Sequence, residues 1–274
     1  MNWFEALLLG IIQGISEFLP ISSSAHLVIA EKLLGIQMST SNLTFEVLLH
    51  AASLLAVICF FWRDLLEIIK DFFTYLFFNS EKAKTNYRFA WLIVGATLIT
   101  MGVGKGIEGL IGDNITQAST IGAALIVTGL FLILIEHGVN VGNRTVKEMT
   151  WKDCIIIGIG QALAVIPGIS RAGSTLIVSL WCGLDKKTAV RYSFLLSIPV
   201  ILGITILKLP ELTAETFAGV GFELAIACIA SFIFAIIGIK WLIQMLNQAK
   251  LTYFAIYCIA LGTITWIFLK DIQV

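Results

Sequence analysis

The chain has 274 residues, of which 58% are apolar and 13% are charged, and its mean hydropathy is +0.94. Soluble domains are about 45–50% apolar and about 25% charged, so this composition excludes a soluble enzyme and indicates a protein that crosses a membrane several times. Eighteen Lys and Arg balance 18 Asp and Glu, so no basic surface for a nucleic acid is expected.

Long apolar stretches predict the helical elements in chain order. A spanning helix needs about 20 residues that are mostly apolar, and six stretches are long enough. Two more stretches are apolar but broken halfway. We therefore predict an all-α polytopic membrane protein with a broken hairpin over 4–34, spans over 45–62, 89–110 and 118–136, a second broken hairpin over 154–183, and spans over 192–208, 222–245 and 251–269.

The two broken stretches predict re-entrant hairpins. Pro20 and Pro167, two of only four prolines, stand at the two breaks, and proline ends a helix. Each half can cover only part of a hydrocarbon core that is about 30 Å thick. Backbone of this kind is tolerated at membrane depth only where protein or a water-filled cavity surrounds it.

Lys and Arg residues predict the orientation. Most of them lie in four segments, 63–88, 137–152, 184–191 and 240–250. The excess of positive charge lies on the cytoplasmic side of membrane proteins. This places both termini outside, so the first hairpin enters from outside and the second from the cytoplasm.

The opposite orientation of the two hairpins predicts an inverted repeat within one membrane domain, 1–274. Setting Gln13 against Gln161 aligns Ile21-Ser22 with Ile169-Ser170 without a gap. The repeats are then about 1–137 and 151–270. Such repeats place a site near the midplane, where half-helices meet.

The first break carries groups that are costly inside a membrane. Gln13 and Glu17 share one helix face, and a carboxylate at bilayer depth costs at least about 2.5–3.5 kcal/mol, so we expect Glu17 to be functional. Close helix packing is an equally good explanation for small polar residues, and Gln13 could bond freed backbone groups. His50 is ambiguous. The other polar residues of this break are Ser22, Ser23, Ser24 and His26.

The second break has the composition of an anion site. It restarts a helix behind Ser170, and a helix N-terminus with free N–H groups and an arginine binds anions. Arg171 can grip phosphate oxygens with two parallel hydrogen bonds. Close packing explains Gly168 and Ser174 equally well. We predict that the following residues bind phosphate groups: Gln13, Ser22, Ser24, Gly168, Ser170, Gly173, Ser174 and Thr175.

These two breaks resemble the signatures of the bacterial undecaprenyl pyrophosphate phosphatase family, which is associated with bacitracin resistance. The Glu/Gln-x-x-x-Glu motif matches Gln13 to Glu17, and the Pro-Gly-x-Ser-Arg-Ser/Ala-Gly motif matches Pro167 to Gly173. The resemblance implies cleavage of undecaprenyl diphosphate to undecaprenyl phosphate and orthophosphate, with Mg²⁺ or Ca²⁺. It also implies a site open to the outer face of the bacterial cytoplasmic membrane.

The chemistry of such a site can be assigned to residues of both breaks. Glu17 is expected to hold the cation with Gln13 or to act as general base, and Arg171 to clamp the diphosphate. Candidates for the attacking group are His26, Ser23 and a metal-bound water. We prefer His26 as nucleophile or base with Ser23 beside it; the alternative is that His26 only bonds a phosphate oxygen.

Two other classes of protein compete with a phosphatase. A secondary transporter or lipid flippase also uses inverted repeats and midplane hairpins. A lipid phosphatase of the type-2 phosphatidic acid phosphatase superfamily ranks low, because its Lys-x6-Arg-Pro and Pro-Ser-Gly-His signatures are absent. The sequence is compatible with a homodimer and does not fix the oligomeric state.

Overall fold

A computed structural model describes residues 1–36, 40–111, 117–138, 142–208, 221–248 and 250–268. The described residues form helices and no sheet. In chain order they are α1 (Trp3–Phe18), α2 (Ser23–Leu33), α3 (Thr40–Phe60), α4 (Trp62–Phe78), α5 (Lys84–Ile111), α6 (Ala118–Gly138), η2 (Val146–Glu148), α7 (Trp151–Ala162), η3 (Leu163–Val165), α8 (Arg171–Trp181), α9 (Lys186–Lys208), α11 (Gly221–Asn247) and α12 (Leu251–Phe268).

Five described helices, α5, α6, α9, α11 and α12, are long and apolar enough to cross a membrane. They correspond to five of the six predicted spans. The sixth predicted span, 45–62, lies in α3, which meets the same measure only together with α4, from which it is bent by 74°. The all-helical, multi-span prediction is therefore confirmed at the level of five to six candidate spans.

Helix α4 lies in the segment 63–88, for which no helix was predicted. Its exposed residues Leu66, Ile69, Phe73 and Phe77 recur at helical spacing and form an apolar stripe. Charged residues recur between them in the first half of the helix, at Arg63, Asp64, Glu67, Lys70 and Asp71, so the segment is amphipathic. The charged residues interrupt the apolar periodicity, so the sequence pattern does not reveal this helix.

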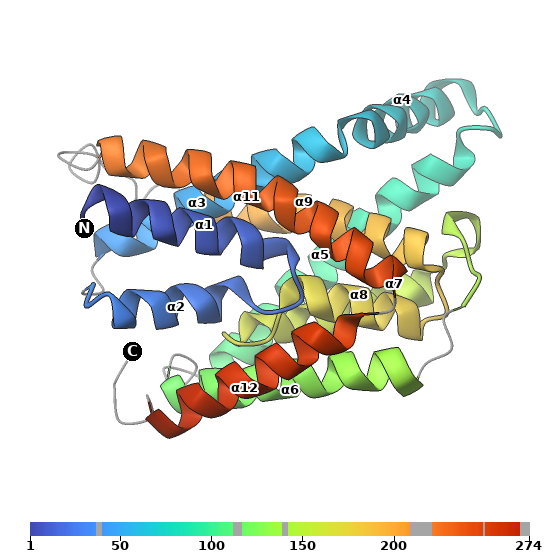
Figure 1. Cartoon of the computed structure of the whole chain (residues 1–274). Helices are drawn as coiled ribbons and strands as arrows, with labels where there is room; N and C mark the ends of the chain where they lie inside the picture. The colour runs from blue at the N-terminus through green and yellow to red at the C-terminus, as the bar shows by residue number, and fades with distance from the viewer. Residues whose placement is uncertain (37–39, 112–116, 139–141, 209–220, 249, 269–274) are drawn as a thin grey trace.

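The two broken stretches form pairs of short helices that lie side by side. In Figure 1, α1 and α2 run from one end of the molecule to its centre and back, and α7 and α8 do the same from the opposite end. Helix α1 ends at Phe18, two residues before Pro20, and α8 begins directly after its N-cap, Ser170. The turns of both pairs therefore meet in the middle of the molecule.

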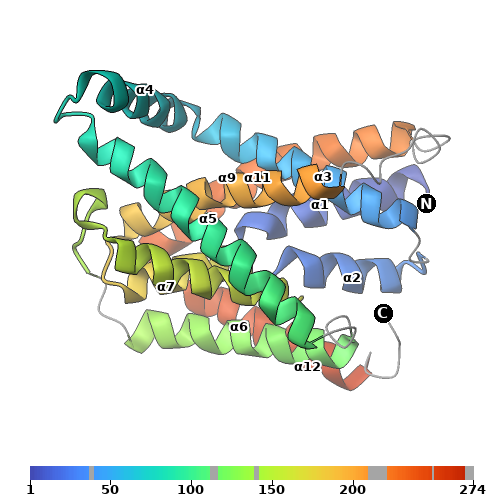
Figure 2. The ribbon, with the colours of Figure 1, turned by 180° about the vertical axis from the view of Figure 1, so that it is seen from behind.

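Longer helices hold each pair of short helices in place. Helix α1 packs on α11 and α7 packs on α5, while α6 and α12 pack on each other (Figure 2). Glycines allow these close approaches. A Cβ at Gly14 would lie 2.4 Å from the Ser231 carbonyl oxygen on α11, and one at Gly158 would lie 3.0 Å from the Ala96 oxygen on α5.

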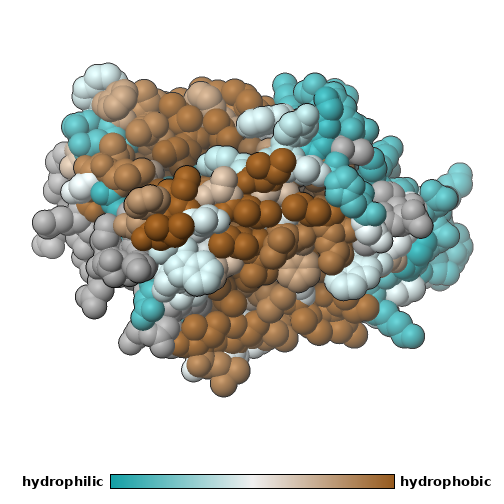
Figure 3. Space-filling model, turned by 60° about the horizontal axis from the view of Figure 1, so that its bottom comes forward, coloured by the Kyte–Doolittle hydropathy of each residue, from teal (hydrophilic) through white to brown (hydrophobic). Residues whose placement is uncertain are grey.

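Large apolar side chains cover much of the outer surface. Figure 3 shows a broad hydrophobic surface, with the hydrophilic residues gathered at its margins and mainly at one end. The exposed apolar residues come from many elements, among them Leu98 on α5, Ile229 on α11 and Ile256 on α12. An apolar belt with polar ends is the surface expected of a protein surrounded by lipid.

Candidate active site

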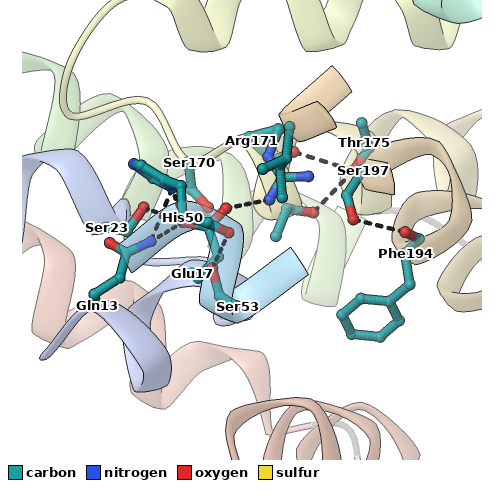
Figure 4. A network of polar contacts seen from close by, with 12 residues as sticks. Gln13, Glu17, Ser23, His50, Ser53, Ser170, Arg171, Thr175, Phe194 and Ser197 are labelled. Atoms are coloured by element: carbon teal, nitrogen blue, oxygen red, sulfur yellow. Dashed lines mark hydrogen bonds and ion pairs between the residues drawn. The ribbon is translucent and has the colours of Figure 1, made fainter. Parts of the chain in front are cut away.

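Glu17 is the centre of a buried polar network at the point where the two turns meet. Its side chain receives hydrogen bonds at Oε2 from Gln13 Nε2 and Ser23 Oγ, each at 2.8 Å. His50 Nδ1 lies 3.1 Å from the same oxygen. Glu17 is 5% exposed and Gln13 is fully buried. Figure 4 shows this group of side chains, which come from α1, α2 and α3.

Arg171 joins the second hairpin to this network. Its Nη2 donates to Glu17 Oε1 and forms an ion pair with that carboxylate. Arg171 is the first residue of α8, and the Ser170 hydroxyl accepts the Gly173 N–H and caps the helix at 3.0 Å. The arginine and the positive end of the α8 dipole thus point to the same place. Two residues that are far apart in the sequence form one charge pair.

Hydrogen bonds between the two turns fix their relative position. The Gly168 N–H donates to Ser22 Oγ at 3.1 Å, and Ser170 Oγ donates to the Leu19 carbonyl oxygen at 3.3 Å. Ser22 has a φ of 70°, a region that serine rarely adopts and that costs about 1–3 kcal/mol. Such backbone is maintained only when its surroundings determine it, and it concentrates at functional sites.

The role of His50 is ambiguous from the sequence, and the structure places this residue in the Glu17 network. Its Nδ1 lies 2.8 Å from Gln13 Nε2 as well as near Glu17. Its side chain is 27% exposed, so the ring borders both the buried network and open space. A usable signal was present, because a histidine inside an apolar helix needs a polar partner. That partner lies on another helix, so the spacing of residues within the segment around His50 cannot identify it.

His26 lies on α2 and is held by two other groups. Its Nδ1 lies 2.7 Å from the Ser22 carbonyl oxygen, and its Nε2 lies 2.7 Å from the hydroxyl of Tyr257 on α12. The two rings are stacked with centroids 5.5 Å apart. In the described structure His26 therefore contacts Ser22 and Tyr257, and no bond joins it to the network around Glu17. Its role as nucleophile or base stays a prediction.

The remaining predicted residues lie at or near the two turns. Ser24 Oγ is 3.3 Å from Ser22 Oγ, and Ser174 is partly buried on the first turn of α8. Thr175 is directed at α9: its hydroxyl bonds that of Ser193 and the helix carbonyl of Arg171. Their predicted contacts with phosphate stay predictions.

The two glycines of the second turn make close approaches within the protein. Gly168 has a φ of 103°, and a Cβ there would lie 2.6 Å from the Ile121 carbonyl oxygen on α6. At Gly173 a Cβ would lie 3.1 Å from the Ser170 Cβ. Gly168 is therefore required by its conformation and by packing on α6.

The oxygen atoms near Glu17 suit a hard divalent cation. Gln13 Oε1 is buried and has no hydrogen-bond partner in the described structure, and the Nε2 atom of the same amide group donates to the Glu17 carboxylate. Mg²⁺ and Ca²⁺ prefer such ligands, and Mg²⁺ is often held by one or two carboxylates together with substrate phosphates. Among the described residues no group of three or more His, Cys, Asp or Glu could enclose a metal. A cation here would need oxygens from its substrate or from water.

A known protein family matches this chain over most of its length. The sequence profile described as bacitracin resistance protein BacA matches residues 6–264. The chain belongs to the BacA family. The match includes both helix breaks, so the resemblance of their motifs is confirmed.

Relatives of this BacA-family chain resemble it over nearly their whole length. A Shouchella clausii protein named undecaprenyl-diphosphatase 1 is 48% identical over 98% of this chain and 97% of its own length. Undecaprenyl-diphosphatase 2 of Halalkalibacterium halodurans is 50% identical over 96% of this chain and 94% of its own length. An undecaprenyl-diphosphatase of Methanosphaera stadtmanae is 40% identical over 97% of both chains.

Proposed function

We propose that the chain hydrolyses undecaprenyl diphosphate to undecaprenyl phosphate and orthophosphate, and so recycles the carrier lipid for cell-wall synthesis. The observation that carries this proposal is the ion pair of Glu17 and Arg171, which unites the two helix breaks. The names of the relatives supply the substrate. The apolar belt provides access from the bilayer for a polyprenyl chain.

Arg171 binds the diphosphate in this proposal. Only Nη2 bonds another side chain in the described structure, so the other guanidinium N–H groups remain for phosphate oxygens. A planar guanidinium donates two parallel hydrogen bonds to such a group. The α8 N-terminus adds positive potential at the same point. Phosphoryl transfer depends mainly on this kind of positioning and charge neutralisation.

Glu17 accepts the proton of the attacking hydroxyl group. Ser23 Oγ already donates a hydrogen bond to Glu17 Oε2, which supports Ser23, or a water in its place, as the attacking group. The ion pair with Arg171 holds the Glu17 carboxylate in this orientation. His26 remains the alternative nucleophile or base, and the bond from Nε2 to Tyr257 would have to open for an attack through that atom.

A divalent cation would be held by Gln13 Oε1 and the Glu17 carboxylate. When bound, it would neutralise charge on the diphosphate. The test is addition of a chelator to the purified protein. We expect orthophosphate release to stop and to return with Mg²⁺ or Ca²⁺, and unchanged release in the chelator would contradict a cation requirement.

An inverted repeat with two re-entrant hairpins accounts for the way these elements pack. Helix α1 packs on α11 in the other half, and α7 packs on α5 in the same reciprocal manner. The hydroxyl of Thr128 on α6 donates to the Gly168 carbonyl, and the thiol of Cys258 on α12 donates to that of Pro20. These paired contacts support repeats of about 1–137 and 151–270. We place the site in the bacterial cytoplasmic membrane, open to the outside.

The decisive experiment separates hydrolysis from transport. The purified protein in detergent is given undecaprenyl diphosphate, and orthophosphate is measured; no transport can occur because no compartment exists. We expect release by the wild type and by Glu67→Gln, an exposed control on α4, and almost none by Glu17→Gln. Absence of release by the wild type, with lipid movement in vesicles, would favour a flippase. Light scattering of the same sample distinguishes a monomer from a homodimer.

A further inference from the structure

Tyr257 on α12 and His26 on α2 form a polar contact beside the first turn. Helix α2 lies between α1 and the pair of α6 and α12 (Figures 1 and 2). The Tyr257 hydroxyl lies 2.7 Å from His26 Nε2, and the two rings stack with an angle of 19° between their planes. The next residue, Cys258, donates its thiol to the Pro20 carbonyl oxygen. Helix α12 is therefore bonded to the first hairpin both at its turn and on α2.

Tyr257 does not have the position of an interfacial tyrosine. Tyrosines gather near the ends of spanning helices, at the membrane interfaces, whereas Tyr257 is the seventh of the 18 residues of α12. It is 45% exposed on the outer surface, and its chain neighbour Ile256 is 59% exposed. A hydroxyl at this depth needs a partner within the protein, because lipid tails offer none. The ring of His26 supplies that partner.

The surroundings of the His26 ring determine which nitrogen carries its proton. The Nδ1 atom lies 2.7 Å from the Ser22 carbonyl oxygen, which only accepts hydrogen bonds, so Nδ1 is the donor. In a neutral imidazole Nε2 is then an acceptor, and the Tyr257 hydroxyl donates to it. No carboxylate bonds His26 in the described structure to compensate a positive charge on the ring. The carbonyl and the phenol therefore select the same neutral tautomer.

Ser22 connects the His26 ring to the candidate active site. The Ser22 carbonyl belongs to the planar peptide bond that carries the Ser23 N–H, so a bond to this carbonyl orients the start of Ser23. The backbone N–H of His26 also donates to the same oxygen, but at 3.3 Å, compared with 2.7 Å for the ring nitrogen. Ser22 has a φ of 70°, which its surroundings must maintain. The ring of His26 therefore supports the peptide that leads into the hydroxyl bonded to Glu17.

We propose that Tyr257 is a positioning residue for Ser23, on which it acts through the ring of His26. This inference rests on the proposed function, with Ser23 as the attacking group. The phenol holds the imidazole as the Nδ1–H tautomer, and this N–H holds the peptide before Ser23. The peptide in turn directs Ser23 Oγ to Glu17. The consequence is that Tyr257 affects the rate of the chemical step and leaves substrate binding by Arg171 unchanged.

The tautomer can be determined without any catalysis. NMR spectra of the purified protein with ¹⁵N-labelled histidines are recorded in detergent, and His26→Ala identifies the signals of this ring. Tyr253→Phe is the control, because Tyr253 lies one turn earlier on α12 and is 62% exposed. We expect a neutral His26 with its proton on Nδ1 in the wild type and the control. In Tyr257→Phe we expect the Nε2 signal to move, because this nitrogen has lost its donor.

Two spectra would contradict this assignment. A wild-type His26 with its proton on Nε2 would overturn the proposal, since the Ser22 carbonyl would then have no ring donor. A Tyr257→Phe spectrum identical to that of the wild type would overturn it as well, because the phenol would have no effect on the ring.

The effect on the reaction is tested by the kinetics of orthophosphate release. We expect Tyr257→Phe to lower kcat by about 10–100-fold with little change in KM, because a displaced reacting group costs about this much. Tyr253→Phe should match the wild type. An unchanged or higher kcat would show that the phenol only covers Nε2 and would overturn the proposal. A raised KM with an unchanged kcat would place Tyr257 in substrate binding and would also contradict it.

A double variant separates positioning from a general loss of stability. In His26→Ala the phenol has no ring to act on, so adding Tyr257→Phe should lower kcat no further. A second, equal loss in that background would show that Tyr257 acts through the packing of α12, contrary to the proposal. A wild type that releases no orthophosphate would instead overturn the proposed function, whereas the His26 spectra would still report on Tyr257.

Discussion

At the scale of single residues, the site depends on polar side chains that converge on the Glu17 carboxylate. Gln13 bonds it from the same helix, Ser23 bonds it from α2, and Arg171 reaches it from the other half of the chain. The sequence predicted all four as site residues, because polar and charged groups inside apolar segments must be paired or functional. It could not predict the pairing of Glu17 with His50, since that contact depends on how α1 and α3 pack.

Alanine substitutions separate the roles of three residues of the first hairpin. Glu17→Ala is expected to reduce orthophosphate release by about 10²–10⁴-fold, because it removes the proton acceptor. If Ser23 is the attacking group, Ser23→Ala is expected to lose as much activity as Glu17→Ala. His26→Ala is then expected to retain more activity than either of these variants. Turnover of purified, correctly folded variants measures this. A His26→Ala loss that equals that of Glu17→Ala, with an active Ser23→Ala, would return the attacking role to His26.

Gly168 permits a test of backbone strain at the second turn. Gly168→Ala is expected to lower the free energy of unfolding by about 1–3 kcal/mol, since alanine disfavours a φ of 103° and its Cβ would clash with Ile121 on α6. Thermal unfolding in detergent measures the loss. Gly102→Ala is the control, because a Cβ there meets nothing within 4 Å. Equal stability of the two variants would show that the turn relaxes at no cost.

At the scale of elements, the connection between α6 and α7 holds the second hairpin at the end that lies away from the centre of the molecule. Arg144 donates both terminal nitrogens to the Asp153 carboxylate and also bonds the Cys182 and Glu148 carbonyl oxygens. Asp153 is 4% exposed and caps α7 together with Thr150. One arginine therefore joins the start of α7 to the end of α8.

Removal of this arginine is expected to destabilise the second hairpin. Arg144→Ala removes the positive partner of a buried carboxylate, which keeps only its bonds from Thr150, and the arginine bonds to two carbonyl groups. This costs about 1–3 kcal/mol after allowance for the partial exposure of the arginine. Lys84→Ala is the control, since it breaks an exposed pair with Glu81 and should change the melting temperature little. Indistinguishable melting temperatures in detergent would contradict this role.

The elements were predicted from the sequence more completely than their contacts. Five spans and both breaks follow from apolar length and proline positions. Helix α4 was missed because its charges obscure the apolar stripe of Leu66, Ile69 and Phe73. The reciprocal bonds of Ser22 and Ser170 could not be predicted in detail, because a sequence repeat indicates equivalent positions and gives no distance between them.

At the scale of the whole molecule, the two hairpins reach the centre from opposite ends (Figure 1). In the proposed topology, the connection of α4 and α5 faces the cytoplasm and the segment 209–220 faces outward. Glu81→Cys and Ala214→Cys, each in a cysteine-free background, are expected to react with an impermeant thiol reagent from opposite sides. Ala214 lies outside the described residues, so the test is independent of the structure there. Labelling of both from one side would contradict the inverted repeat.

The central claim is that Glu17 and Arg171 act as one unit in cleaving a diphosphate. The most direct measurement is the rate of orthophosphate release from undecaprenyl diphosphate by the wild type, Glu17→Gln, Arg171→Lys and the double variant, with Arg63→Lys as an exposed control. We predict that each single variant loses most activity, that the double variant is no worse than the singles, and that the control matches the wild type. Near-normal turnover in a folded Arg171→Lys protein would contradict the account.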